Sequence, residues 1–280
     1  MKLNIVPART GTQWVRQGIQ TFWRHPMALS ALFFLCMAAM SLVSIFPVVG
    51  PALALALLPT MSLVMMVGAA ESMQGRMPTP ALILVAFRTG RQRMHAMALL
   101  GAFYAVGFLL VMGVSALVDG GEFAMVYLGS TPMTPELAQE SDFQVAMWLS
   151  MLLYLPLSLM FWHAPGLVHW HAIPPAKALF FSFIACWRNL GAFVVFFLSW
   201  VGVFIATGLV LALLTALLSA LVGDLAAGLM VGAAMMLAAM FFTSVVFTFR
   251  DCFSAPDGHD ELEEDDGVTY TPHDSNQNPQ

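Results

Sequence analysis

Three histidines form the densest group of side chains that could do chemistry in this sequence. His169 and His171 flank Trp170, and His163 lies six residues before the pair. Histidine is a common metal ligand, and an H-x-H pair can hold a metal ion when its segment is extended. No carboxylate lies nearby in the sequence, and Trp162 and Trp170 are typical of a membrane–water boundary. We therefore weigh a metal site at the histidines against a boundary turn, and we favour the turn.

Three arginines precede long apolar runs at equivalent places. When they are aligned, a glycine or proline falls 13 residues before each of them, giving the pairs Gly11 and Arg24, Pro80 and Arg93, and Pro175 and Arg188. An arginine at a helix end can extend its guanidinium to phosphate-level water. The more specific alternative is contact with an anionic lipid head group where the repeated units meet.

The remaining reactive residues do not suggest catalysis. Glu71 and Asp119 follow apolar runs, Asp224 lies between two runs, and none is at the centre of a run, where an ion-coupled pump usually carries an ionisable residue. We find no phosphate-binding glycine loop, G-x-S-x-G or H-E-x-x-H motif, so no cofactor is predicted. The cysteines lie far apart in the sequence and are predicted to be free thiols: Cys36, Cys186 and Cys252.

The composition requires a membrane. The 280 residues are 59% hydrophobic and 10% charged, whereas soluble domains carry roughly 25% charged residues. Apolar runs of full bilayer length begin at Met27, which also argues against a cleavable signal peptide. Only short basic clusters occur, so nucleic-acid binding is not predicted.

The hydropathy pattern predicts an all-α membrane protein. Six transmembrane helices would form three hairpins, each preceded by an amphipathic helix on the cytoplasmic side. The predicted spans are residues 27–46, 49–70, 97–118, 145–162, 192–222 and 225–249. Pro59 and Pro156 fall inside spans and predict kinks. Residues 1–254 would form the membrane domain, and the acidic residues 255–280 a disordered cytoplasmic tail.

Small residues predict where helices approach closely. The third span contains Gly101, Gly107 and Gly113, and the sixth contains a G-x-x-x-G pair at Gly228 and Gly232. Before the first span, apolar side chains recur with helical spacing around Trp14, which predicts a helix lying in the membrane interface.

Charge is segregated between the two sides of this topology. All 11 Lys and Arg residues fall on the side of the termini, and the other side carries only acidic residues: Asp119, Glu122, Glu136, Glu140, Asp142 and Asp224. The positive-inside rule therefore predicts that both termini are cytoplasmic.

Several short motifs carry a family resemblance. They are VPARTG at 6–11, PVVGP at 47–51, PPAKA at 174–178, CWRN at 186–189 and FRD at 249–251. Together they resemble an uncharacterised family of bacterial six-span inner-membrane proteins, over nearly the whole chain except the acidic tail. The layout is more distantly similar to the membrane-anchor domain of glycerophosphodiester phosphodiesterases, whose catalytic domain is absent here. The resemblance implies a bacterial inner-membrane location and supplies no catalytic residues.

Three functions remain open from the sequence. The first is a non-enzymatic protein that organises the envelope or its lipids, with anionic lipids or another membrane protein as partner. The second is a transporter or exporter of a small or lipidic solute. A mid-membrane cavity with convergent polar groups would favour transport, and the sequence offers Thr60, Ser62, Ser115 and Ser158. The third is an intramembrane metalloenzyme at the histidines.

Overall fold

The structure, a computed structural model, describes residues 2–47, 49–88, 90–222 and 225–254. The predicted tail 255–280 and the predicted turn at 223–224 lie outside the described residues. The elements in chain order are β1 (Lys2–Leu3), α1 (Thr10–Phe22), α2 (Pro26–Ser44), α3 (Val49–Met73), η1 (Pro80–Leu84), α4 (Val85–Arg88), α5 (Arg91–Asp119), α6 (Glu122–Tyr127), α7 (Pro135–Gln139), α8 (Ser141–Trp162), α9 (Ala164–His171), α10 (Pro175–Arg188), α11 (Leu190–Val222), α12 (Leu225–Cys252) and β2 (Phe253–Ser254).

Six of the described helices are long and apolar enough to cross a membrane: α2, α3, α5, α8, α11 and α12. They lie where the hydropathy pattern predicts spans, and the protein is an α-helical membrane protein. Helix α5 begins at Arg91 and α8 at Ser141, several residues before the predicted spans 97–118 and 145–162. Backbone hydrogen bonds can continue a helix past its apolar part into polar surroundings, so the ends of these helices differ from the ends of the predicted spans.

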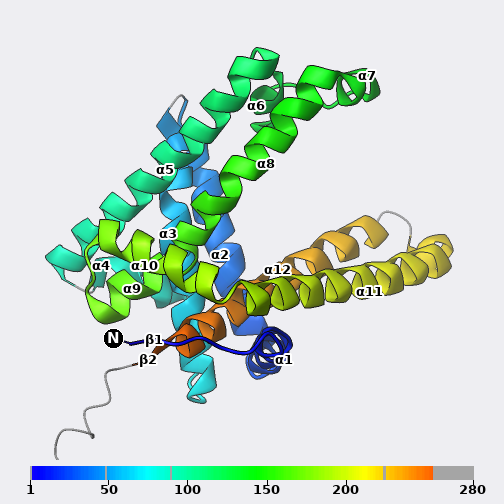
Figure 1. The fold of residues 1–280 in the computed structure, drawn as a ribbon. Coiled ribbons are helices and arrows are strands. Elements are labelled where there is room, and N and C mark those ends of the chain that lie inside the picture. The colour runs from blue at the N-terminus through cyan, green and yellow to red at the C-terminus, as the bar shows by residue number, and fades with distance from the viewer. Residues whose placement is uncertain (1, 48, 89, 223–224, 255–280) are drawn as a thin grey trace, which may run out of the picture.

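The spanning helices fall into two groups that diverge from a shared base (Figure 1). Helix α3 packs between α2 and α5, and α5 packs along α8. Helices α11 and α12 extend away from this group, and α12 contacts α3 and α2 along part of its length. The space between α8 and the α11–α12 pair therefore widens away from the base.

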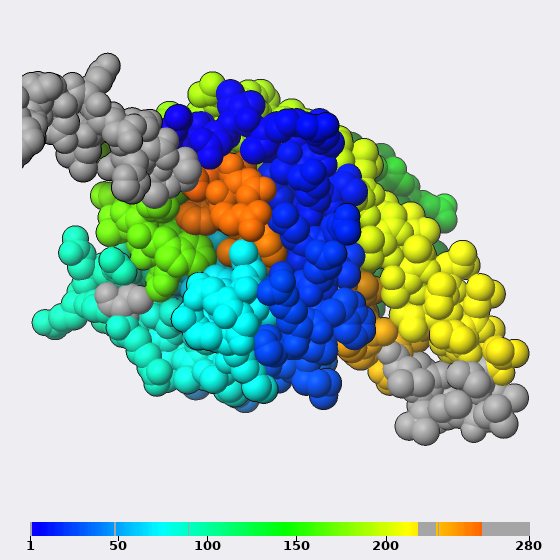
Figure 2. Space-filling view, turned by 90° about the horizontal axis from the view of Figure 1, so that it is seen from below, coloured from blue at the N-terminus to red at the C-terminus, as the bar shows by residue number. Residues whose placement is uncertain are grey.

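Helix α1 fastens the base of the α11–α12 pair. Its Trp14 and Phe22 side chains are fully buried, and it packs against both α11 and α12. Figure 2 shows the blue N-terminal segment beside the orange end of α12. Most of its apolar stripe packs against protein, where two glycines allow the backbones to meet, whereas Trp23 at the end of the stripe is exposed. A Cβ on Gly11 would overlap the Ala192 carbonyl, and one on Gly18 would overlap Ser244.

Both ends of the membrane domain lie at the same end of the molecule. Strands β1 and β2 pair antiparallel, with Leu3 opposite Phe253. The Asn189 amide group donates to the Asn4 carbonyl at 3.0 Å and accepts from the Val6 N–H at 2.8 Å. Ends that share a side require an even number of crossings. We call this the basic end, because the Lys and Arg residues lie in the segments around it.

The opposite, acidic end carries the loop between α5 and α8. Asp119 accepts hydrogen bonds from the backbone N–H groups of Gly121 at 2.9 Å and Phe123 at 2.6 Å. These contacts satisfy two donors at the start of α6, as a capping residue does. Thr134 caps α7 by accepting from the Leu137 N–H at 3.3 Å. The acidic loop is therefore folded around two short helices.

Candidate functional site

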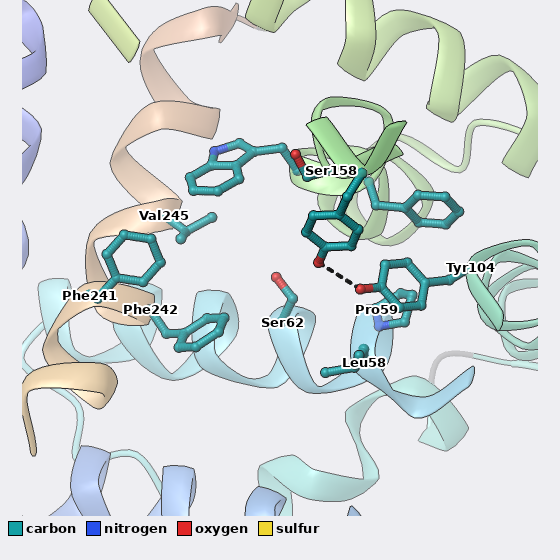
Figure 3. A pocket seen from close by; sticks show the side chains of 11 residues that line it. Leu58, Pro59, Ser62, Tyr104, Ser158, Phe241, Phe242 and Val245 are labelled. Atoms are coloured by element: carbon teal, nitrogen blue, oxygen red, sulfur yellow. Dashed lines mark hydrogen bonds between the residues drawn. The ribbon is translucent and has the colours of Figure 1, made fainter. Parts of the chain in front are cut away.

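A cavity of about 200 Å³ lies among α3, α5, α8 and α12 and is seen from close by in Figure 3. We call it the central cavity. Its wall is formed by Leu58, Pro59, Ser62, Tyr104, Tyr154, Ser158, Phe161, Trp162, Phe241, Phe242 and Val245. Ser62, Tyr104 and Tyr154 lie near the middle of their helices. Part of the wall of the central cavity therefore comes from the middle of candidate spanning helices, and part of it, at Trp162 and Val245, from nearer the ends of α8 and α12.

Four hydroxyl groups interrupt the apolar wall of the central cavity. The Tyr104 and Tyr154 hydroxyls share a hydrogen bond of 2.9 Å, and the Ser158 hydroxyl donates to the Leu155 carbonyl at 2.7 Å. The Ser62 hydroxyl points into the space (Figure 3). Within the described ranges no hydrogen bond joins the Ser62 hydroxyl to another residue. This hydroxyl can therefore hydrogen-bond to a ligand in the central cavity. Polar groups away from water cost free energy unless they are paired, so this arrangement suits a ligand with a polar group.

The prolines of the predicted kinks lie close to these hydroxyls. Pro59 lines the central cavity, and Pro156 lies in α8 between Tyr154 and Ser158. A proline inside a helix removes one backbone donor and leaves the carbonyl four residues earlier without its helical partner. In α3 that carbonyl belongs to Leu55, and in α8 it belongs to Leu152. Both helices therefore have weakened hydrogen bonding at membrane depth, as helices that line a transport path can have.

A second hollow, which we call the lateral groove, lies on the other side of α8. Its volume is about 370 Å³, and it runs between α8 and α11. It shares Tyr154, Ser158 and Trp162 with the central cavity, so these side chains form the partition between the two spaces. The rest of its wall is Met151, Leu155, Leu159, Leu190, Phe193, Val194 and Phe197. An apolar chain in the lateral groove and a polar group in the central cavity would meet at this partition.

The four serines and threonines predicted to converge do so only in part. Ser62 and Ser158 line the central cavity. Thr60 faces another apolar hollow, of about 450 Å³, among α2, α3, α4 and α5. Ser115 is buried and donates to the Met112 carbonyl of its own helix at 2.9 Å. Helix rotation decides which face a hydroxyl occupies, and spacing in the sequence does not fix the rotation of one span against another.

Two tyrosines that no sequence motif singles out meet in the central cavity. The chain has only 4 tyrosines, and tyrosine is usually enriched at membrane interfaces. Tyr104 and Tyr154 instead lie near the centres of α5 and α8. Their unusual depth in the predicted spans was a signal that could have identified them.

His163 is a fully buried structural residue at the basic end. Its Nε2 lies 3.1 Å from the Thr248 hydroxyl, which itself donates to the Val245 carbonyl at 2.7 Å. The other ring nitrogen, Nδ1, faces the Cys186 thiol at 3.7 Å. Both ring nitrogens of His163 therefore have a polar neighbour within the core.

This Cys–His pair does not have the character of an activated nucleophile. Burial, with a smaller contribution from Cys252, raises the pKa of the Cys186 thiol well above its ordinary value. Catalytic cysteines have a lowered pKa, because the thiolate is the nucleophile. The pair thus acts as neutral packing between α8, α10 and α12.

The other two predicted histidines do not join His163 in a ligand cluster, although His163 and His171 both pack against the ring of Phe249. Both are on α9, which is helical rather than extended. His169 packs against Trp170, and His171 packs against Phe249. Among the described residues no group of three or more His, Cys, Asp or Glu side chains could hold a metal ion.

The three aligned arginines occupy different surroundings. The Arg24 guanidinium donates to the Met73 carbonyl at 3.0 Å, at the last residue of α3. Arg93 lines a cavity at the start of α5. Arg188 is exposed at the last residue of α10. The described contacts give no shared pocket for the three side chains.

The six candidate spanning helices define a polytopic α-helical membrane protein, and a comparison with known proteins supports an inner-membrane location. The chain is 37% identical over 256 residues to a probable inner membrane protein of Burkholderia thailandensis, covering 90% of this chain and 94% of that protein. The chain belongs to the family of this inner-membrane protein. No family model matches the chain, and no solved structure matches it.

Proposed function

We propose that this protein is a non-enzymatic transporter of a lipidic or other small amphipathic solute. The observation that carries the proposal is the central cavity, where Ser62, Tyr104, Tyr154 and Ser158 gather hydroxyl groups at membrane depth. A closed apolar bundle would need none of them. The lateral groove between α8 and α11 supports an entrance from the side of the bundle.

The lining chemistry restricts the solute. The described walls of the central cavity and the lateral groove contain no Asp, Glu, Lys, Arg or His. An ion at this depth would be costly without a partner, so the group that reaches the hydroxyls is uncharged and polar. An ester, a hydroxyl or an amide attached to an apolar chain fits both spaces.

The absence of an enzymatic role is part of the proposal. Cys186 and His163 pair a nucleophile type with a base type, but the thiol pKa is raised. The Thr248 hydroxyl, which also meets His163, donates to the Val245 carbonyl. The central cavity itself is lined by hydroxyls and hydrocarbon. Binding and passage therefore account for the site better than bond cleavage.

A second candidate function is the organisation of lipids at the basic end, alone or as a subunit of a membrane complex. Within the described ranges the ion pair found is Arg250 with Asp251, at 2.9 Å. The other Lys and Arg side chains there lack acidic partners, which favours contact with anionic lipid head groups.

We also propose the orientation and the internal repeat. The basic end would face the cytoplasm, as the positive-inside rule requires. The repeat would consist of α1 before α2–α3, η1–α4 before α5–α8, and α10 before α11–α12. All three units would enter the membrane from the same side, which is the arrangement of parallel repeats.

Reconstitution tests the transport proposal directly. The full chain would be placed in vesicles of phosphatidylethanolamine and phosphatidylglycerol that contain a trace of fluorescent lipid. Addition of dithionite destroys the fluorescence of the outer leaflet only. Vesicles with the protein should lose the inner-leaflet signal as well, because the labelled lipid moves across.

Two variants locate the path. Ser62→Phe would fill the central cavity and should slow lipid movement about tenfold or more. Ser41→Phe makes the same change at an exposed site on α2 and should leave the rate unchanged. If the wild-type protein moves no lipid and no lipidic molecule co-purifies with it on native mass spectrometry, the proposal is wrong.

A further inference from the structure

A cavity of about 320 Å³ at the basic end lies apart from the central cavity and the lateral groove. It is formed where the first turn of α5 meets the connection between α9 and α10 (Figure 1). Its lining residues, which define the Arg93 cavity, are Gln92, Arg93, Ala96, Val168, Ala172, Ile173, Pro174 and Pro175. None of them lines the central cavity.

We infer that the Arg93 cavity binds the phosphate group of an anionic phospholipid. Arg93 supplies the only charged side chain on its described wall, and no acidic residue of the described chain pairs with it. A guanidinium presents a fork of donors that matches phosphate oxygens. A cation that lines a cavity and lacks an acid favours an anion as occupant.

Two neighbouring features add to the attraction of an anion. Gln92 places an amide donor on the same wall. Helix α5 begins at Arg91, so the backbone N–H groups of its first turn have no partner within the helix and carry the positive end of its dipole. These donors reinforce the charge of the side chain in the cavity.

The rest of the wall selects a lipid over a soluble anion. Val168, Ile173, Pro174 and Pro175 present hydrocarbon beside the guanidinium. Because all 11 basic residues occur in segments of the basic end, the cavity lies at the level of the lipid phosphates. A phospholipid would place its phosphate on Arg93 and its glycerol and first methylene groups on this apolar surface.

Arg93 differs in this respect from its two aligned counterparts. The Arg24 guanidinium already donates a hydrogen bond to the Met73 carbonyl at the end of α3. Arg188 is exposed, as Arg93 is, but it is not among the lining residues of the Arg93 cavity. Arg188 therefore provides a matched control, with the same side chain at the same end of the molecule.

Native mass spectrometry of the full chain in a mild detergent tests the assignment. The probes are dioleoyl phosphatidylglycerol, dioleoyl phosphatidylcholine and inorganic phosphate. Wild-type protein should retain phosphatidylglycerol in preference to phosphatidylcholine, and Arg93→Gln should lower the affinity about tenfold or more, the loss typical of a charge-assisted hydrogen bond. Arg188→Gln should bind as the wild type does.

A second variant tests the cavity without changing charge. Ala96→Phe fills the space beside Arg93 and should also reduce phosphatidylglycerol binding, while a thermal unfolding curve checks that the chain remains folded. Equal losses in Arg93→Gln and Arg188→Gln would overturn the assignment, because they would indicate only general attraction to the basic end. If inorganic phosphate bound as tightly as phosphatidylglycerol, the proposal that the bound phosphate group belongs to a lipid would be wrong.

The site stands independently of the transport proposal. Ser62→Phe should slow lipid movement and leave phosphatidylglycerol binding at the Arg93 cavity intact. Loss of binding in Arg93→Gln therefore reports on this cavity alone.

Discussion

Asp251 holds helix α1 against the bundle through two side chains. Its Oδ2 accepts from the Trp14 indole N–H at 2.8 Å, and its Oδ1 accepts from Arg250 at 2.9 Å. Arg250 in turn donates to the Gln17 side chain at 3.1 Å. Trp14 is fully buried, so its indole N–H depends on this carboxylate.

We expect Asp251→Ala to destabilise the protein by about 1–3 kcal/mol, because a buried donor left without an acceptor costs about that much. Asp251→Asn keeps an acceptor for the indole and should cost less. Thermal unfolding in detergent measures both changes. Equal stability of Asp251→Ala and the wild type would mean that apolar packing alone holds α1.

The Cys186 thiol should be unreactive in the folded protein. Its raised pKa keeps it protonated at pH 8, and only the thiolate reacts rapidly. The folded state holds this proton to a higher pH than the unfolded chain does. The contribution of the thiol to stability is therefore complete below the ordinary thiol pKa and falls as the pH rises above it.

Iodoacetamide labelling with peptide mass spectrometry checks this prediction. Modification of Cys186 should be slow from pH 7 to 9 and should become fast when the chain is unfolded in dodecyl sulfate. Rapid modification of the folded protein at pH 8 would show an accessible thiolate and contradict the burial. A cysteine introduced at the exposed residue Ser130 gives the rate of an open thiol.

The surroundings of a residue were predicted well where they follow from its chemical type, and poorly where they depend on how one helix is rotated against another. The cysteines are free and buried in the described structure, as their sequence spacing indicates. His163 lies in the core beside Thr248. Neither of the two predictions for this residue, a boundary turn or a metal site, included that contact. A histidine buried beside a hydroxyl has the same sequence signature as one at a surface, because its partner comes from a distant helix.

Among the elements, α1 depends most on close backbone contact. Gly18 has no room for a Cβ, which would overlap the Cβ of Ser244 on α12. Gly18→Leu should displace α1 and cost about 1–3 kcal/mol, as other overpacked sites do. Faster cleavage by trypsin at Arg16, together with a lower unfolding temperature, would record the displacement.

Gly113 provides the matched control for this change. No heavy atom lies within 4 Å of the position where its Cβ would be, so Gly113→Leu should leave both readouts unchanged. If Gly18→Leu and Gly113→Leu changed the cleavage rate and the unfolding temperature equally, the close contact between α1 and α12 would not be important for stability.

The elements themselves were largely predictable, and their packing was not. Apolar runs predict six spans, and six described helices have the length and hydropathy to cross a membrane. Of the predicted packing glycines, Gly101 meets the Ala56 carbonyl and Gly107 meets Leu157, while Gly228 has no neighbour within 4 Å. An amphipathic stripe such as that of α1 fits lipid or protein equally well, so the sequence could not decide between them.

At the scale of the whole molecule, the separation of charge and the paired termini support the proposed topology. The strands β1 and β2 bring the two ends of the membrane domain together, at the end that carries the basic segments. The α6–α7 loop lies at the far end with the acidic residues (Figure 1). The orientation of this axis across the membrane follows from charge alone.

Cysteine accessibility in intact bacterial cells tests that orientation. The three native cysteines are buried, so the wild type should give little background with a charged thiol reagent that does not cross the inner membrane. Ser130→Cys, in the acidic-end loop, should be labelled from outside. Gln74→Cys, exposed after α3 at the basic end, should be labelled only after the membrane is permeabilised. The reverse pattern would place the basic end outside and would contradict the cytoplasmic position of both termini, whereas labelling of both sites would contradict their separation by the membrane.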